Sequence, residues 1–281
     1  MRAFNRVLFH AAWPLLVALT APALAGEGTW TEPVSGIEFA RLPAGCFMMG
    51  EPAPGIPKEA DVAPLQRADE QPRHSACVAE FWIARTELAW QQWQRVSALP
   101  LPPRARPAQA AFGLSWADAN DWLRDLTAKA GAPGTRFRLP TEAEWEYACR
   151  AGNSEPVFSG DVEGLRKLHR ELTRVAWYKV PDFPDRWAHE VGRKQANAWG
   201  LHDMLGNVME WVEDQYRADA YVWKMAKAAM PGDTTRLRVV RGGSYKSYEG
   251  AARCGARASL EEDDRLPTAG MRVVMERRET K

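Results

Sequence analysis

The alternation of apolar and polar positions predicts short strands, few helices and much ordered loop. Strands are expected over 37–49, with a turn at Pro43 to Gly45, and over 77–85, 237–245 and 270–275. Helices are expected over 86–96 and 115–130, and after Pro140 to about Cys149, with Thr86, Ser115 and Thr141 as N-caps. Neither an internal repeat nor a linker interrupts residues 33–275. The pattern therefore predicts one compact α+β domain.

The densest pattern in the chain runs from Asn197 to Trp211. Large apolar side chains are interspersed there with glycines that permit tight turns and with the polar oxygens of Asp203 and Glu210. A buried irregular loop leaves carbonyl groups that need partners, and carbonyl and carboxylate oxygens are the ligands that calcium prefers. We therefore hypothesise a loop folded around a calcium ion. A well-packed turn with both carboxylates at the surface is the alternative.

Composition narrows the class of protein. The 13 tryptophans predict a core built from large rings, whose indole N–H groups need buried acceptors. The 37 basic residues nearly balance the 36 acidic residues, which argues against nucleic acid as a partner.

The first 25 residues have the pattern of a cleaved export signal. Arg2 and Arg6 precede a mainly apolar run, and Ala23-Leu24-Ala25 has the small-residue form of a cleavage site. We expect the mature domain to cover residues 26–281, to lie in the periplasm and to contain no transmembrane segment. An uncleaved anchor is the less favoured alternative, because the apolar run is short.

An even number of cysteines in an exported chain suggests disulfides. Three pairings of Cys46, Cys77, Cys149 and Cys254 are possible. We favour Cys46 with Cys77 and Cys149 with Cys254, because each bond would join segments that are expected to be ordered.

Two glutamates, Glu142 and Glu146, lie four positions apart on the predicted helix that follows Pro140. Such a pair can perform acid–base chemistry. More often it forms a solvated face or anchors nearby arginines, and we favour that interpretation.

Four stretches together resemble the formylglycine-generating enzyme, or sulfatase-modifying factor, family. They are Gly45 to Gly50, Arg138 to Cys149, Asn197 to Trp211, and Arg241 to Tyr245 together with Gly270 to Arg272. The resemblance implies a C-type-lectin-like α+β fold with little regular secondary structure. It also implies one structural calcium ion, bound by the side chains of Asp203 and Glu210 and the carbonyl groups of Gly206 and Val208.

The sequence departs from this family at the catalytic segment. The family's oxidase binds copper through two cysteines that follow the Gly-Gly-Ser turn. Here Ser247 falls near the first cysteine, the second has no counterpart, and Cys254 matches a structural cysteine. Hydroxyl and ammonium groups do not replace soft thiolates as copper(I) ligands, so we expect no formylglycine formation. The remnant cleft is expected to contain Met209, Ser244, Lys246, Ser247, Tyr248 and Arg257.

The resemblance leaves three functions open. Cysteine-lacking relatives include a periplasmic regulator of type VI secretion that acts upstream of a membrane Ser/Thr kinase. By similarity we expect a non-catalytic regulator whose partner is the extracytoplasmic part of such a kinase or an outer-membrane lipoprotein, contacted through loops 52–71, 100–107 and 216–233. The alternative is a periplasmic maturation enzyme on the same fold, as in siderophore maturation, with Tyr248 or Glu249 as acid–base group. Carbohydrate binding rests on fold analogy alone.

Overall fold

A computed structural model describes residues 28–51, 68–98, 100–153, 164–180, 187–226 and 235–277. The predicted export signal, residues 1–25, lies outside these ranges. Within them, the helices are all too short or too polar to cross a lipid bilayer. The described ranges form a mixture of small sheets and short helices, which confirms the predicted α+β class.

The larger sheet has five strands in the order β1-β2-β5-β13-β6, and all its neighbours are antiparallel. Its members are β1 (Thr29–Thr31), β2 (Glu38–Leu42), β5 (Phe81–Ala84), β13 (Val274–Arg277) and β6 (Thr135–Arg138). Strands from the start, middle and end of the chain therefore meet in one sheet, and this arrangement joins distant segments into one body.

The second sheet has four strands in the order β11-β10-β9-β12. They are β11 (Arg257–Glu261), β10 (Leu237–Arg241), β9 (Met209–Gln215) and β12 (Ala269–Met271), of which β9 and β12 run parallel. The strand predicted over 270–275 is thus two strands in different sheets. The chain leaves one sheet at Arg272, whose side chain is fully buried between them.

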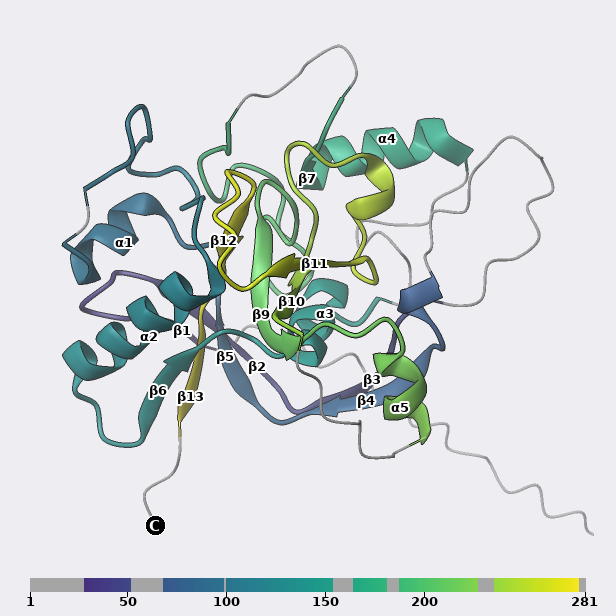
Figure 1. Cartoon of the computed structure of the whole chain (residues 1–281), viewed down its shortest axis with the longest axis horizontal. Helices are drawn as coiled ribbons and strands as arrows, with labels where there is room; N and C mark the ends of the chain where they lie inside the picture. Colours follow the sequence, from purple (N-terminus) through teal and green to yellow (C-terminus); the bar gives the residue numbers. More distant parts are fainter. Residues whose placement is uncertain are drawn as a thin grey trace, which may run out of the picture.

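Two strand pairs complete the sheet structure. One is β3 (Gly45–Met49) with β4 (His74–Val78), and the other is β7 (Ala176–Trp177) with β8 (Leu205–Gly206). Figure 1 shows the pair β3–β4 on the opposite side of the molecule from α1 and α2.

The helices are α1 (Trp90–Val96), α2 (Trp116–Ala130), α3 (Glu142–Arg150), α4 (Gly164–Val175) and α5 (Ala220–Ala226), with short 3₁₀ turns at Ala68–Glu70 and Glu249–Ala251. Figure 1 shows α3 near the centre of the molecule, beside β9 and β10, and the other helices toward its periphery. Sequence patterning missed α4 and α5. The sequence of α4 does carry a helical period, because Leu165, Leu168, Leu172 and Val175 recur at spacings of three and four.

Two of the three predicted helix starts are confirmed. Ser115 and Thr141 each accept a hydrogen bond from the backbone of the third helical residue, which completes a capping box with Asp118 and Glu144 respectively. The predicted cap at Thr86 is wrong. The chain bends at Arg85 and Thr86, and Leu88 then forms backbone hydrogen bonds with Met271 and Ala111, so α1 begins only after the extended residue Ala89.

Tryptophan rings fill much of the core, as the composition predicted. Trp93 stacks on Trp122 with ring centroids 5.8 Å apart, and the Trp122 indole donates to the carbonyl of Trp93 at 3.0 Å. The Trp211 indole donates to the carbonyl of Leu114 at 2.7 Å. Buried carbonyls thus serve as acceptors for Trp122 and Trp211, whereas the indole N–H groups of Trp90 and Trp93 are buried without a hydrogen-bond partner.

Two disulfides join segments that are distant in the sequence. They are Cys46–Cys77, across the pair β3–β4, and Cys149–Cys254, which ties the end of α3 to the segment before β11. These are the pairs that the sequence favoured. Cys149 and Cys254 are fully buried, whereas Cys46 and Cys77 are exposed.

We expect the two disulfides to differ in their contribution to stability. The Cys149–Cys254 bond spans 105 residues and the Cys46–Cys77 bond 31 residues. Loop-closure entropy alone makes the first worth about 5 kcal/mol and the second about 4 kcal/mol. Denaturant unfolding of Cys149→Ala/Cys254→Ala and Cys46→Ala/Cys77→Ala should show the larger loss for the buried pair. An equal or larger loss for the exposed pair would contradict this account.

Candidate functional site

The stretch from Asn197 to Trp211, the central loop, has left-handed backbone conformations where its chain turns. The φ angles are 55° at Asp203, 79° at Gly206 and 55° at Asn207. Position 206 must be glycine, because a Cβ atom there would lie 1.9 Å from the carbonyl oxygen of Trp177. The close approach of β7 and β8 therefore depends on this residue.

Glu210 is buried beneath the loop and is fully occupied by partners within the chain. The Arg272 Nη2 group donates to Glu210 Oε1 at 2.8 Å, and its Nε group lies 3.0 Å from Oε2. The Trp145 indole donates to Oε2 at 2.7 Å. Arg272 also donates to the carbonyls of Ala84 and His202. One ion pair thus connects β5, the central loop and β9.

Asp203 has a different environment. Its Oδ2 atom accepts from the backbone N–H of Gly192, whereas its Oδ1 atom is buried without a hydrogen-bond partner. Burial raises the pKa of Asp203, and the Gly192 N–H and Arg272 only partly offset this effect. A buried oxygen without a donor is an unfavourable arrangement that a cation would relieve.

A third carboxylate, Glu87, was not found from the sequence. It accepts hydrogen bonds from the Asn207 amide and from the backbone N–H of Val208, and so holds the central loop from the side. Burial raises the pKa of Glu87 well above its usual value, and the charges of Asp203 and Glu210 raise it further. Glu87 lies at the start of the helix predicted over 86–96, where no local pattern marks it as part of a site.

The two predicted side-chain ligands, Asp203 and Glu210, do not offer equal ligand capacity. Asp203 supplies a free oxygen, whereas Arg272 and Trp145 already bind both oxygens of Glu210. Within the described ranges, no group of three or more His, Cys, Asp or Glu side chains has the geometry of a metal site. Of the two predicted side-chain ligands, only Asp203 has an oxygen without a hydrogen-bond partner, and calcium binding stays a prediction.

In the remnant cleft, the polar side chains satisfy one another. The hydroxyl groups of Ser244 and Ser247 lie 3.1 Å apart, and the Ser247 hydroxyl accepts from the Ser244 backbone at 3.0 Å. Lys179, which the sequence did not single out, donates to the Tyr248 hydroxyl at 2.8 Å. The backbone N–H of Lys179 also donates to the carbonyl of Ser247. Lys179, Ser244, Ser247 and Tyr248 therefore form one group.

The other residues expected in the cleft have different neighbours. Arg257 is buried and binds Glu142, with its Nε 2.6 Å from Oε1. Met209 is half-buried and packs against the tryptophan-rich core. The ammonium group of Lys246 lies 5.6 Å from the ring centroid of Tyr245. Lys246 is still joined to the Ser244–Ser247 pair, because its backbone N–H donates to the Ser244 hydroxyl at 3.3 Å. The contacts of Met209 and Arg257 lie elsewhere.

Glu142 and Glu146 are buried anchors for arginines and do not form a solvated face. Glu142 binds Arg257, and Glu146 binds Arg241 and Arg150. Burial would raise the pKa of Glu142, but Arg257, Arg241 and Lys224 outweigh burial and lower it to about 2. A carboxylate with so low a pKa cannot act as a general acid or base near neutral pH.

Comparison with known proteins agrees with the fold. Residues 30–277 match the model of the sulfatase-modifying factor enzyme 1-like domain, and the chain belongs to this family. It is 29% identical over 296 residues to the formylglycine-generating enzyme of Mycobacterium tuberculosis, covering 84% of this chain and 97% of that relative.

Two further similarities involve other proteins. The solved structure of PvdO from Pseudomonas aeruginosa is 25% identical with a TM-score of 0.73, covering 89% of this chain and 98% of PvdO. The serine/threonine-protein kinase pkn1 of Chlamydia caviae is 34% identical over 122 residues, which is 43% of this chain but only 18% of the kinase.

The copper chemistry implied by the family resemblance has no ligands here. All four cysteines of the chain are in disulfides, and Cys254 is bonded to Cys149. The nearest counterpart of a catalytic cysteine is the hydroxyl group of Ser247. The residues present therefore do not fit a copper(I) site.

The pKa of Glu142 predicts a pH-dependent contribution to stability. A folded-state pKa of about 2, below the ordinary value of 4.5, stabilises the fold above pH 4.5, and this stabilisation is lost as the pH falls towards 2. We expect Glu142→Gln to lower the free energy of unfolding by about 3 kcal/mol at neutral pH and by much less near pH 2.

Denaturant unfolding at a series of pH values measures this effect. Glu190→Gln is a matched control, because Glu190 pairs with the exposed Arg193. A loss in Glu142→Gln that is the same at every pH would contradict the electrostatic explanation.

Proposed function

We propose that this chain is a non-catalytic periplasmic binding protein that regulates a membrane Ser/Thr kinase, as in type VI secretion. The observation that carries the proposal is the state of the catalytic segment. Ser247 stands near the position of a copper-binding cysteine, its hydroxyl group is paired with Ser244, and every cysteine of the chain is in a disulfide. The fold is kept while the groups needed for the family's oxidation are absent.

Two observations support a protein partner, and the first of them favours the kinase class. A kinase contains a segment related to this chain, so the two kinds of module occur together in one relative. The exposed apolar side chains Val222 and Met225 lie on α5, within one of the loops expected to face a partner. Exposed apolar side chains three residues apart on a helix can enter one contact surface.

Crosslinking in the intact cell envelope, followed by capture of the tagged protein, tests this proposal. We expect recovery of a membrane Ser/Thr kinase or an outer-membrane lipoprotein, and loss of that partner in Val222→Asp/Met225→Asp. Leu266→Asp is the matched control, because Leu266 is also exposed but lies outside α5. Recovery of soluble background alone would contradict the regulator proposal.

A maturation enzyme on the same fold is the second candidate. The similarity to PvdO over most of both chains favours it, as does the exposed Tyr248 hydroxyl beside the Lys179 ammonium. Ser247→Ala and Tyr248→Phe distinguish the two candidates. An enzyme acting in this cleft loses turnover of its metabolite in these variants, whereas capture of a protein partner through α5 is unchanged.

We also propose one structural calcium ion in the central loop, bound by Asp203, Gly206, Val208 and Glu210. A ligand at about 100 times its dissociation constant stabilises a fold by about 3 kcal/mol. EGTA should therefore lower the melting temperature of the native protein, and it should have no further effect on Asp203→Asn.

The control for this measurement is Asp125→Asn, at an exposed position of α2. If neither EGTA nor Asp203→Asn changes the melting temperature, the ion is absent and Arg272 alone compensates Glu210.

A further inference from the structure

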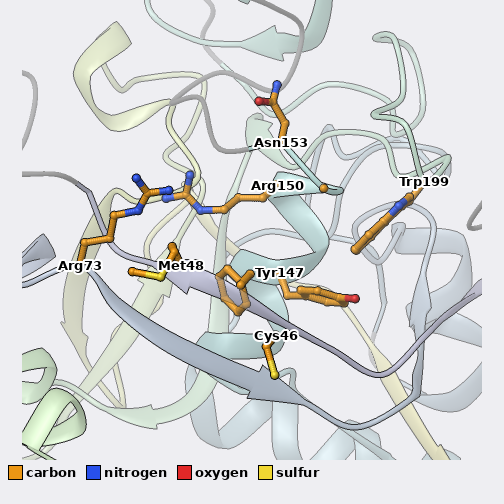
Figure 2. Close-up of a pocket in the computed structure, with 9 residues that line it drawn as sticks. Cys46, Met48, Arg73, Tyr147, Arg150, Asn153 and Trp199 are labelled. Carbon is orange, nitrogen blue, oxygen red and sulfur yellow. The ribbon is translucent and has the colours of Figure 1, made fainter. Parts of the chain in front are cut away.

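A pocket of about 340 Å³ lies between β3 and the end of α3, away from the Ser244–Ser247 pair. Residues from β3, α3, the segment before β4 and the central loop line it (Figure 2). This volume is within the range of pockets that bind small molecules. Four segments that are distant in the sequence thus meet around one hollow that the proposed regulatory function does not use.

Aromatic rings form one wall of this pocket. The ring centroids of Phe47 and Tyr147 lie 5.5 Å apart, and those of Tyr147 and Trp199 lie 4.7 Å apart, with tilted planes in both pairs. Met48, at the same pocket, is 44% exposed. Rigid aromatic surfaces with an adaptable thioether beside them suit a flat apolar group.

Two arginines provide the polar side of the pocket. In Figure 2 the side chains of Arg73 and Arg150 extend toward one another, so that their guanidinium groups converge. Arg150 is already compensated, because it binds Glu146 at 2.8 Å and Glu51 at 3.1 Å. The buried carboxylates Glu146 and Glu51 therefore balance the charge of Arg150.

Arg73 differs from Arg150. Its Nε atom is buried without a hydrogen-bond partner, and none of the ion pairs found in the described part of the chain includes it. A guanidinium group is always charged near neutral pH and binds carboxylates through paired hydrogen bonds. Arg73 is thus an uncompensated cation next to an aromatic wall.

From this arrangement we propose that the pocket binds a small molecule with a flat aromatic body and a carboxylate group. The Arg73 guanidinium binds the carboxylate, and Phe47, Tyr147 and Trp199 contact the aromatic body. The proposal does not depend on the kinase partner or on calcium. It assigns the chain a ligand site separate from the cleft that corresponds to the family's catalytic segment.

Two probes of matched shape test this proposal by isothermal titration calorimetry. They are 1-naphthaleneacetate and its neutral amide, 1-naphthaleneacetamide, which share the ring system and differ in charge. We expect the full mature protein to bind the carboxylate at least about tenfold more tightly than the amide, since a hydrogen bond to a charged group contributes that much. Arg73→Gln should remove this preference and leave binding of the amide unchanged.

The control variant is Arg124→Gln, because Arg124 lines a different hollow, beside α2. It should keep the preference for the carboxylate. Trp199→Leu should weaken the binding of both probes equally, because Trp199 contacts the aromatic body that the two probes share. Equal affinity for the two probes, a preference that survives Arg73→Gln, or no saturable binding of either probe would overturn the proposal.

Discussion

The ion pair between Glu210 and Arg272 is the interaction on which the rest of the structure depends. Arg272 lies between β12 of one sheet and β13 of the other. The side chains of Arg272 and Glu210 are both buried. The Arg272 guanidinium group reaches carbonyls of β5 and of the central loop as well as the carboxylate on β9. Removing either charge would leave the other buried and unpaired, at a cost of about 3–5 kcal/mol.

The central loop also concentrates buried carboxylates around Arg272. Glu87, Asp203 and Glu210 place three carboxylates around one guanidinium group, and burial together with their mutual repulsion raises the pKa of Glu87. The fold holds this excess of acidic groups through hydrogen bonds from Asn207 and from the backbone of Val208 and Gly192.

Local patterns predicted the elements whose causes are local. The caps Ser115 and Thr141 depend on residues three positions away, so single-sequence reasoning found them. The division of 270–275 into β12 and β13 depends on the contacts that Arg272 makes with β9 and β5, and no neighbouring residue indicates it.

The residues of the candidate site were likewise predictable only where a local pattern marks them. Glu210 and Asp203 lie in a recognisable stretch, whereas Glu87, Lys179 and Arg73 reach their sites from distant parts of the chain. Glu142 and Glu146 were interpreted as a solvated face or as arginine anchors, and only the second half of this interpretation agrees with the structure, because arginines of β10 and β11 hold both carboxylates in the interior. Patterns therefore identified the family, and three-dimensional contacts were needed to define each pocket.

The central claim is that this chain keeps the family's fold without its oxidative chemistry. Incubation of the protein with copper(I), oxygen and a sulfatase-derived cysteine peptide, followed by mass spectrometry of the peptide, tests this claim most directly. The account predicts an unchanged peptide mass, because all four cysteines are in disulfides and a hydroxyl group stands near the place of the first catalytic thiol. Formation of the aldehyde product would contradict it.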